Sequence, residues 1–74
     1  MTNTIGTLNK DNFGVNLRKV RLERGFTIEE FAFLIDKSPR LIYDYEDGFK
    51  YPRLETIIDI ALSLDVSVDS LLRK

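Results

Sequence analysis

Basic side chains that could follow phosphates are concentrated near the amino terminus of the chain. Residues 10–24 carry five basic groups against two acidic ones, a net charge of +3, and the basic ones are Lys10, Arg18, Lys19, Arg21 and Arg24. Residues 25–53 carry four basic and six acidic groups, and residues 54–74 carry two and four, so each has a net charge of −2. A local basic face can track phosphates although the whole chain has a net charge of only −1. The alternative is an ordinary solvated helix face, and charge alone favours that alternative.

The side chains that most often carry catalysis or bind metals are missing. The 74 residues include no histidine and no cysteine, so the commonest general base, the commonest metal ligand and any disulfide are absent. There is no glycine-rich phosphate loop, and no carboxylate pair stands out from ordinary surface charge. We therefore expect a protein that is not an enzyme and that has no metal, cofactor or small-molecule ligand.

Length and hydropathy predict one small domain in the cytoplasm. A chain of this length forms a single core, with no room for a separate ligand-sensing domain. The apolar runs are too short to cross a bilayer, and the amino terminus has no signal-peptide pattern. Residues 1–10 are polar and lack periodicity, which predicts a flexible tail. The folded domain is expected over residues 11–74.

A first helix is predicted from Asp11 or Asn12 to about Arg24. Asp11 or Asn12 can cap its amino end, and Gly25 follows as a stop signal. The spacings of four and three place three apolar residues in one buried stripe, which consists of Phe13, Leu17 and Val20.

A second helix is predicted between Thr27 and Asp36. Thr27 and Glu30 have the spacing of a capping box, and Phe26 can pack against Phe31 as a hydrophobic staple. Asp36 suits the end of the helix because it tolerates a left-handed backbone better than most residues. The side chains expected to be buried are Phe31, Ala32, Leu34 and Ile35.

Three further helices complete the prediction. Ser38 and Pro39 open one that Gly48 closes, with Ile42 and Tyr45 pointing inward. Another follows Pro52 over residues 53–64, and its expected buried residues are Leu54, Ile57, Ile58, Ala61 and Leu62. Ser67 caps a last short helix that contains Leu71 and Leu72. Five short helices and no convincing strand predict an all-α bundle.

Four segments in this order carry a family resemblance. They are LRKVRLERG in the first predicted helix, TIEEFAFLID in the second, YEDG at the end of the third, and YPRLETIIDIALSLDVSVDSLL. Over residues 13–72 the chain resembles a Cro/CI-type helix-turn-helix domain of the XRE family. The resemblance implies a compact five-helix lambda-repressor-like fold, with the helix-turn-helix in the second and third helices. It also implies a prokaryotic, phage or mobile-element origin.

The resemblance implies that the third helix enters the major groove of double-stranded DNA. The implied DNA contacts in or beside that helix are Ser38, Pro39, Arg40, Leu41, Tyr43 and Asp44. Arg40 is the only basic residue of the helix and could bind two acceptors on guanine. Lys37, Lys50 and Arg53 would bind phosphates, and so would the amino end of the second helix at Thr27 and Ile28. Arg21 and Glu46 match a pair that forms a structural salt bridge.

Several positions depart from the family pattern. Isoleucine at position 28 replaces a common glutamine that contacts the DNA backbone, so only main-chain amides remain there. Pro39 stands where the third helix often begins with a polar donor. Asp44 puts a negative charge where arginine, serine or glutamine is frequent, although a carboxylate can accept from cytosine N4. Tyr43 fits a sugar or a thymine methyl group, or is an ordinary surface tyrosine.

Extra apolar residues suggest a covered surface. Leu22, Phe33 and Phe49 fall where relatives usually have polar groups, which favours self-association or binding to another protein. By resemblance, the last two helices would form the dimer surface, with Val66, Val68, Leu71 and Leu72. The alternative for these four is a simple extension of the core. A homodimer fits because DNA sites of this family usually consist of two half-sites about one helical turn apart.

These observations favour a sequence-specific, DNA-binding transcriptional regulator of the repressor type. The alternative is a protein-interaction module that keeps the fold but binds DNA weakly or not at all. Ile28, Pro39, Asp44 and the acidic balance argue for the alternative.

Overall fold

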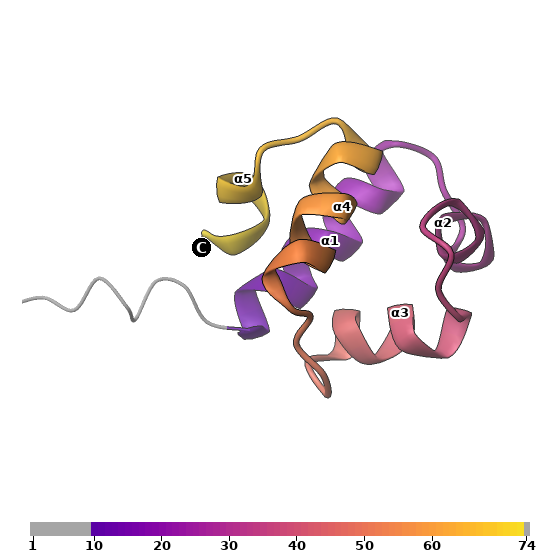
Figure 1. Cartoon of the computed structure of the whole chain (residues 1–74), viewed down its shortest axis with the longest axis horizontal. Helices are drawn as coiled ribbons and strands as arrows, with labels where there is room; N and C mark the ends of the chain where they lie inside the picture. The colour runs from indigo at the N-terminus through magenta and orange to yellow at the C-terminus, as the bar shows by residue number, and fades with distance from the viewer. Residues whose placement is uncertain (1–9, 74) are drawn as a thin grey trace, which may run out of the picture.

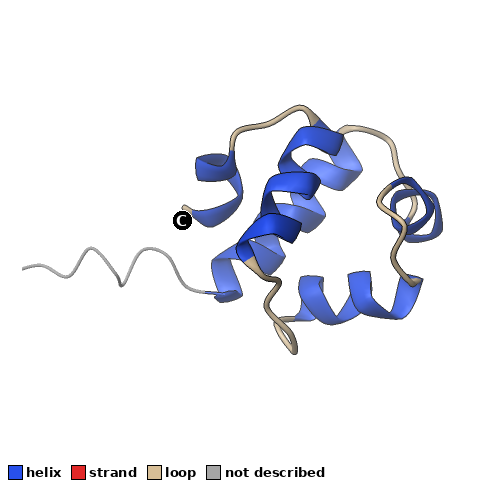
Figure 2. Ribbon diagram, in the orientation of Figure 1, coloured by secondary structure: helices blue, strands red, loops and turns tan. Residues whose placement is uncertain are grey.

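The helices found in the structure follow the predicted order. The computed structural model describes residues 10–73, and within them there are five helices and no strand (Figures 1 and 2). These are α1 (Lys10–Glu23), α2 (Ile28–Leu34), α3 (Pro39–Asp47), α4 (Leu54–Leu64) and α5 (Val68–Leu72). No helix in the described part is long and apolar enough to cross a membrane. Residues 1–9 of the predicted tail lie outside the described residues.

The predicted caps of α2 and α3 are confirmed. The Thr27 hydroxyl accepts the Glu30 N–H at 3.0 Å, and the Glu30 carboxylate accepts the Thr27 N–H at 2.8 Å. Ser38 caps α3, and Gly48 ends it with a left-handed backbone at φ 84°. Asp36 is also left-handed at φ 58°, as expected for the turn between α2 and α3. Local sequence therefore defines both helices of the helix-turn-helix.

The predicted start of α1 is too late. The helix begins at Lys10, so Asp11 and Asn12 lie in its first turn instead of ahead of it. This start also places Lys10 in the helix and not in the tail.

The core is built around the predicted stripe of α1. Phe13 and Leu17 are fully buried and Val20 nearly so. The Phe13 ring makes edge contacts with Tyr45 and Tyr51, with ring centroids 6.2 and 5.6 Å apart. Residues of every other helix join this core, namely Phe31, Ala32, Ile42, Tyr45, Ile57, Ile60, Ala61, Leu64 and Leu71.

The predicted buried face of α4 is partly wrong. Leu54, Ile58 and Leu62 are exposed, and Ile60 and Leu64 are buried in their place. The helix has apolar residues on two overlapping faces, so a period of 3.6 residues fits either face. Packing against the rest of the bundle selects one of them. Leu34, the last residue of α2, was also expected in the core but is 49% exposed.

One residue of the expected dimer surface at the carboxyl end belongs to the core. Leu71 is fully buried, and three neighbours are partly buried against the core, namely Val66, Val68 and Leu72. The Asn16 side-chain amide donates to the Leu71 carbonyl at 3.0 Å and also to the Arg73 carbonyl, which fastens α5 to α1. The prediction that Leu71 contributes to a surface is therefore wrong.

A glycine allows α3 to approach α1 closely. A Cβ atom at Gly14 would lie 2.6 Å from the carbonyl oxygen of Tyr45 and 2.7 Å from that of Glu46. Both are backbone atoms of α3, which cannot move away as a flexible side chain could. Gly14 therefore sets the distance between α1 and the helix that carries the predicted DNA contacts.

We expect Gly14→Ala to destabilise the fold, although alanine is favoured over glycine inside a helix by about 1 kcal/mol. The added methyl group must push α3 away, and overpacking of this kind costs about 1–3 kcal/mol or more. Thermal and urea denaturation followed by circular dichroism measure the change. The control is Val15→Ala, at a neighbouring exposed position, where a change within about 0.5 kcal/mol is expected. Equal stability of Gly14→Ala and wild type would contradict the close contact.

Candidate nucleic-acid interface

A buried ion pair fixes the orientation of α3. Arg21 Nε donates to Glu46 Oε2 at 2.6 Å, and a terminal nitrogen donates to Glu46 Oε1 at 3.1 Å. The other terminal nitrogen donates to the Phe26 carbonyl at 2.7 Å. The two side chains are only 7% and 6% exposed. The predicted salt bridge is thus present, and it joins α1, the turn after α1, and α3.

The charge of Arg21 is stabilised by this arrangement. Hydrogen bonding to Glu46 raises the pKa of the Arg21 guanidinium above its ordinary value, against the opposing effect of burial. The hydrogen bonds to Glu46 thus favour the charged form of Arg21.

Arg21 and Arg24 use their charge inside the molecule. Arg24 donates to the Leu64 carbonyl at 2.7 Å and to the Asp65 carbonyl at 3.2 Å, at the carboxyl end of α4. Cations are favourable there because the helix dipole is negative at that end. Two of the five basic residues in the 10–24 segment thus have structural partners. The basic segment is not simply a face for phosphates.

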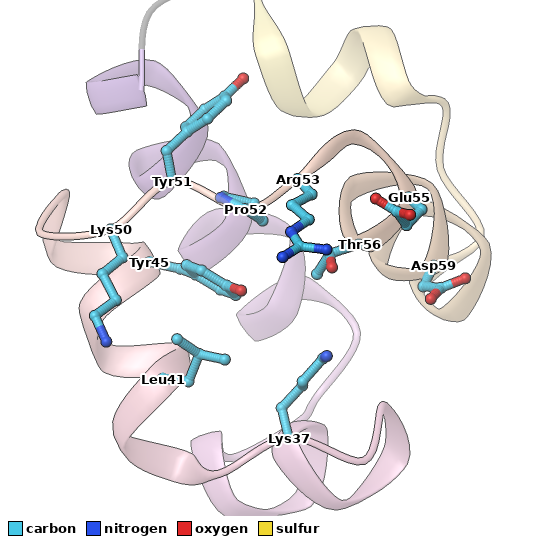
Figure 3. Close-up of a pocket in the computed structure, with 10 residues that line it drawn as sticks. All are labelled: Lys37, Leu41, Tyr45, Lys50, Tyr51, Pro52, Arg53, Glu55, Thr56 and Asp59. Atoms are coloured by element: carbon cyan, nitrogen blue, oxygen red, sulfur yellow. The ribbon is translucent and has the colours of Figure 1, made fainter.

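An open depression of about 570 Å³ lies between α3 and α4 (Figure 3). Three of the predicted phosphate-binding cations line it, namely Lys37, Lys50 and Arg53. In Figure 3 the side chains of Lys37 and Arg53 approach one another from opposite sides of the depression. The lining also includes Glu55 and Asp59 of α4, so the cations outnumber the acidic groups by three to two.

Sequence reasoning missed the remaining lining residues. Besides the two acids, these are Tyr45, Tyr51, Pro52 and Thr56. They belong to α3, the loop after it, and α4, and only the packing of α4 beside that loop brings them together. The tyrosine content of this region was the one available signal.

Asp44 does not point outward, which corrects the sequence prediction. Its side chain is 11% exposed, against 82% for Arg40 and 61% for Lys50. The turn after α3 lies close to this residue, since the N–H groups of Phe49 and Lys50 donate to the Asp44 main-chain carbonyl at 2.9 and 3.2 Å. The Asp44 side chain is therefore mostly covered, whereas those of Arg40 and Lys50 face solvent.

The Asp44 carboxylate is paired with two of the predicted DNA-binding cations. Arg40 Nε lies 3.4 Å from Oδ1, and Lys50 Nζ lies 3.8 Å from Oδ2. Arg40 and Asp44 are four residues apart on α3, a spacing at which opposite charges meet. That spacing was visible in the sequence and indicated this pair. Asp44 thus links a residue of α3 to the loop that borders the depression.

The other predicted contacts differ in how accessible they are. Tyr43 is half-exposed, and Pro39 is exposed at the first turn of α3. Ile28 and Leu41 are partly buried against the core, so little of their side chains is free for DNA. The side-chain oxygens of Thr27 and Ser38 accept N–H groups of their own helices.

The chain matches the profile of a known protein family. A family profile described as helix-turn-helix, HTH_3, matches residues 17–71. The chain belongs to the HTH_3 family. This family is of the XRE and Cro/CI type, so the resemblance seen in the sequence is confirmed. The matched range covers all of α2, α3 and α4, and with them the interface described above.

Solved structures of HTH_3 and related proteins share the fold. The restriction-modification controller protein C.AhdI from Aeromonas hydrophila is 29% identical, with a TM-score of 0.78 over 84% of this chain and 94% of that one. The clp gene regulator ClgR from C. glutamicum is 30% identical, with a TM-score of 0.79 over 84% of this chain and 81% of that one. A search of curated proteins found no match.

Several of the similar structures are of an enzyme. Hydroxypropylphosphonic acid epoxidase from S. wedmorenis is 21% identical, with a TM-score of 0.82 over 89% of this chain but only 35% of that one. This similarity shows the fold alone. The HTH_3 fold therefore also occurs as a part of longer chains.

We expect Glu46→Ala to destabilise the fold by about 3–5 kcal/mol, because it leaves the Arg21 guanidinium buried without its partner. Chemical denaturation measures the free energy of unfolding. Arg73→Ala is the matched control, since it breaks an exposed pair with Asp69 at 2.5 Å and should change stability by less than about 1 kcal/mol. A similar small effect in both variants would show that the Arg21–Glu46 pair is not a structural bond.

Proposed function

We propose that this chain is a sequence-specific, DNA-binding transcriptional regulator of the repressor type, with α3 in the major groove. The observation that carries the proposal is the HTH_3 fold with four cations, Lys37, Arg40, Lys50 and Arg53, on and beside α3. Two similar structures, C.AhdI and ClgR, are described as a controller protein and a gene regulator, which supports the proposal.

The proposed roles of these side chains follow from their positions. Arg40 belongs to α3, and its side chain is 82% exposed. It therefore suits contact with base edges. Tyr43, half-exposed on the same helix, suits a sugar or a thymine methyl group. Lys37, Lys50 and Arg53 come from the turn before α3 and the loop after it, so they suit the phosphates on either side of the groove.

The ion pairs of Asp44 are weak enough to be replaced. The Arg40 and Lys50 side chains are 82% and 61% exposed, and their nitrogens lie 3.4 and 3.8 Å from the carboxylate. These distances are longer than those of strong charge-assisted hydrogen bonds, so both cations can exchange the carboxylate for a phosphate or a base. In the free protein the carboxylate holds both cations near the interface. On this view Asp44 reduces non-specific attraction to DNA without blocking a specific contact.

The proposed oligomeric state and cellular compartment both follow from DNA as the partner. We propose a homodimer, because two half-sites about one helical turn apart need two recognition helices. The cytoplasm is the proposed compartment, since the DNA of a prokaryotic cell is there. We assign no catalytic role. The alternative, a protein-interaction module of the same fold, is separated by the titration below.

The first test is a titration of the purified chain against a random duplex pool and against its own upstream region, at low and moderate salt. A DNA-binding protein gives enrichment of particular sequences and an affinity that falls with salt, because phosphate contacts release counterions. Absence of both enrichment and salt dependence would rule out the proposal in favour of the interaction module.

With a bound sequence in hand, Arg40→Ala should weaken binding by about 1–3 kcal/mol and relax the preference at one base pair. Systematic single-base changes in the duplex, measured with both proteins, detect the relaxation. Arg73→Ala removes the same charge from α5 and should leave the base preference unchanged. An equal loss on every sequence would make Arg40 a phosphate contact and not a base contact.

Asp44→Asn should strengthen binding to any duplex by up to about 1 kcal/mol, the size of an exposed ion pair. The substitution keeps the shape of the side chain but frees Arg40 and Lys50 for phosphates. Dissociation constants at several salt concentrations measure the gain. Asp69→Asn removes one negative charge from α5 and serves as the control. If both variants gained equally, the effect would be one of net charge and not of the Asp44 pairs.

A further inference from the structure

An exposed apolar ridge runs along α4. It consists of Leu54, Ile58 and Leu62, which are 65%, 42% and 74% exposed. Residues four apart lie on one side of a helix, so the three side chains form a continuous row. The ridge is the part of α4 that sequence periodicity placed in the core. A continuous apolar row on the surface of a small protein indicates contact with another molecule.

We infer that this ridge packs against the same ridge of a second copy, with the two α4 helices antiparallel about a two-fold axis at Ile58. The inference rests on the homodimer proposed above and names its interface. Other exposed apolar residues, among them Leu22, Phe33 and Phe49, are spread over several segments, whereas the ridge comes from one helix.

The order of residues in the ridge is self-complementary. Leucine, isoleucine and leucine read the same in both directions around Ile58. In an antiparallel pair, Leu54 of one copy meets Leu62 of the partner, and the two Ile58 side chains meet at the axis. A two-fold interface requires this property, because the same patch must fit itself.

Charge also favours the antiparallel arrangement. Asp65, exposed just after α4, lies about two turns beyond Ile58 and points in nearly the same direction. Antiparallel packing brings it to the amino end of α4 in the partner, where the helix dipole is positive. The residue at that end, Arg53, makes no side-chain capping hydrogen bond to α4, so an acidic side chain from outside is favourable there. In a parallel pair, like ends of the two dipoles would lie together.

The same geometry turns both DNA-binding faces to one side. Successive residues of a helix are rotated by about 100°, so Glu55 and Asp59 lie on one flank of the ridge, and the buried Ala61 lies on the other. Glu55 and Asp59 line the depression next to α3. A two-fold axis perpendicular to both helices keeps corresponding flanks on the same side. Both depressions therefore face one side of the dimer, where a single duplex can reach them.

The first experiment measures the oligomeric state of the purified chain by sedimentation equilibrium over a range of concentrations. Wild type should dimerise, and Ile58→Glu should weaken dimerisation by tenfold or more, since it buries two like charges at the axis. Phe33→Glu puts the same charge on an apolar residue that is 89% exposed on α2 and should leave the dimer intact. Circular dichroism checks that both variants are folded. A monomeric wild type, or loss of the dimer in Phe33→Glu alone, would overturn the inference.

Cysteine pairing tests the orientation of the helices without relying on a disruptive substitution. The chain has no cysteine of its own, so single introduced thiols report on one contact each. Ile58→Cys should form a disulfide-linked dimer under mild oxidation. Leu54→Cys and Leu62→Cys should link to each other when mixed but not to themselves, because like positions are about 12 Å apart along the antiparallel axes. Self-linking of Leu54→Cys with no mixed product would show a parallel pair and overturn the inference.

A DNA titration separates failure of the interface from failure of the proposed function. Folded, monomeric Ile58→Glu should still bind a random duplex with a salt-dependent affinity, since Lys37, Lys50 and Arg53 are unchanged. If wild type is a monomer that binds DNA, the inference fails and the proposed function stands. If wild type dimerises through α4 but binds no DNA, the proposed function fails and the interface stands.

Discussion

The bond between Arg21 and Glu46 is the interaction on which the rest of this small fold depends. One guanidinium holds α3 through Glu46 and the turn before α2 through the Phe26 carbonyl. Two turns earlier on α1, Gly14 lets the backbone of Tyr45 and Glu46 rest against α1. Both contacts hold the last turn of α3 against α1, and α2 is placed by the short turn to α3. A chain without cysteine has no disulfide to support its small core, so such fixed points matter.

The distribution of charge matters more than its sum. The net charge of −1 gives little attraction to DNA, yet Lys37, Lys50 and Arg53 line one depression beside α3. Part of the basic charge of α1 is used internally by Arg21 and Arg24. The Asp44 side chain is mostly buried and pairs with Arg40 and Lys50. This arrangement favours binding through cations at defined positions. It gives little non-specific electrostatic attraction to DNA.

Local sequence signals were sufficient to predict the helices and their caps. They were not sufficient to predict which side of each helix is buried. The capping box at Thr27, the cap at Ser38 and the left-handed Gly48 each involve residues within a few positions, so they could be read directly. The faces of α4 could not, because two overlapping apolar faces satisfy the same helical period. Asp44 was placed outward because its burial depends on tertiary contacts, which helix periodicity does not record. The depression was also missed, since its lining comes from α3, a loop and α4.

By itself the sequence determined five helices, their caps, the inward residues of α1 and α3, and the Arg21–Glu46 pair through its family resemblance. These features depend on spacing along the chain, which sequence records. Tertiary structure alone decided which side of α4 stays outside, that Leu71 completes the core, and that the buried Asp44 also pairs with Lys50. These features depend on which surfaces meet when the helices pack, and residues far apart in the chain supply both sides of each contact. The exposed ridge of α4 follows from the same choice, since only one of its two apolar faces can be covered by a single chain.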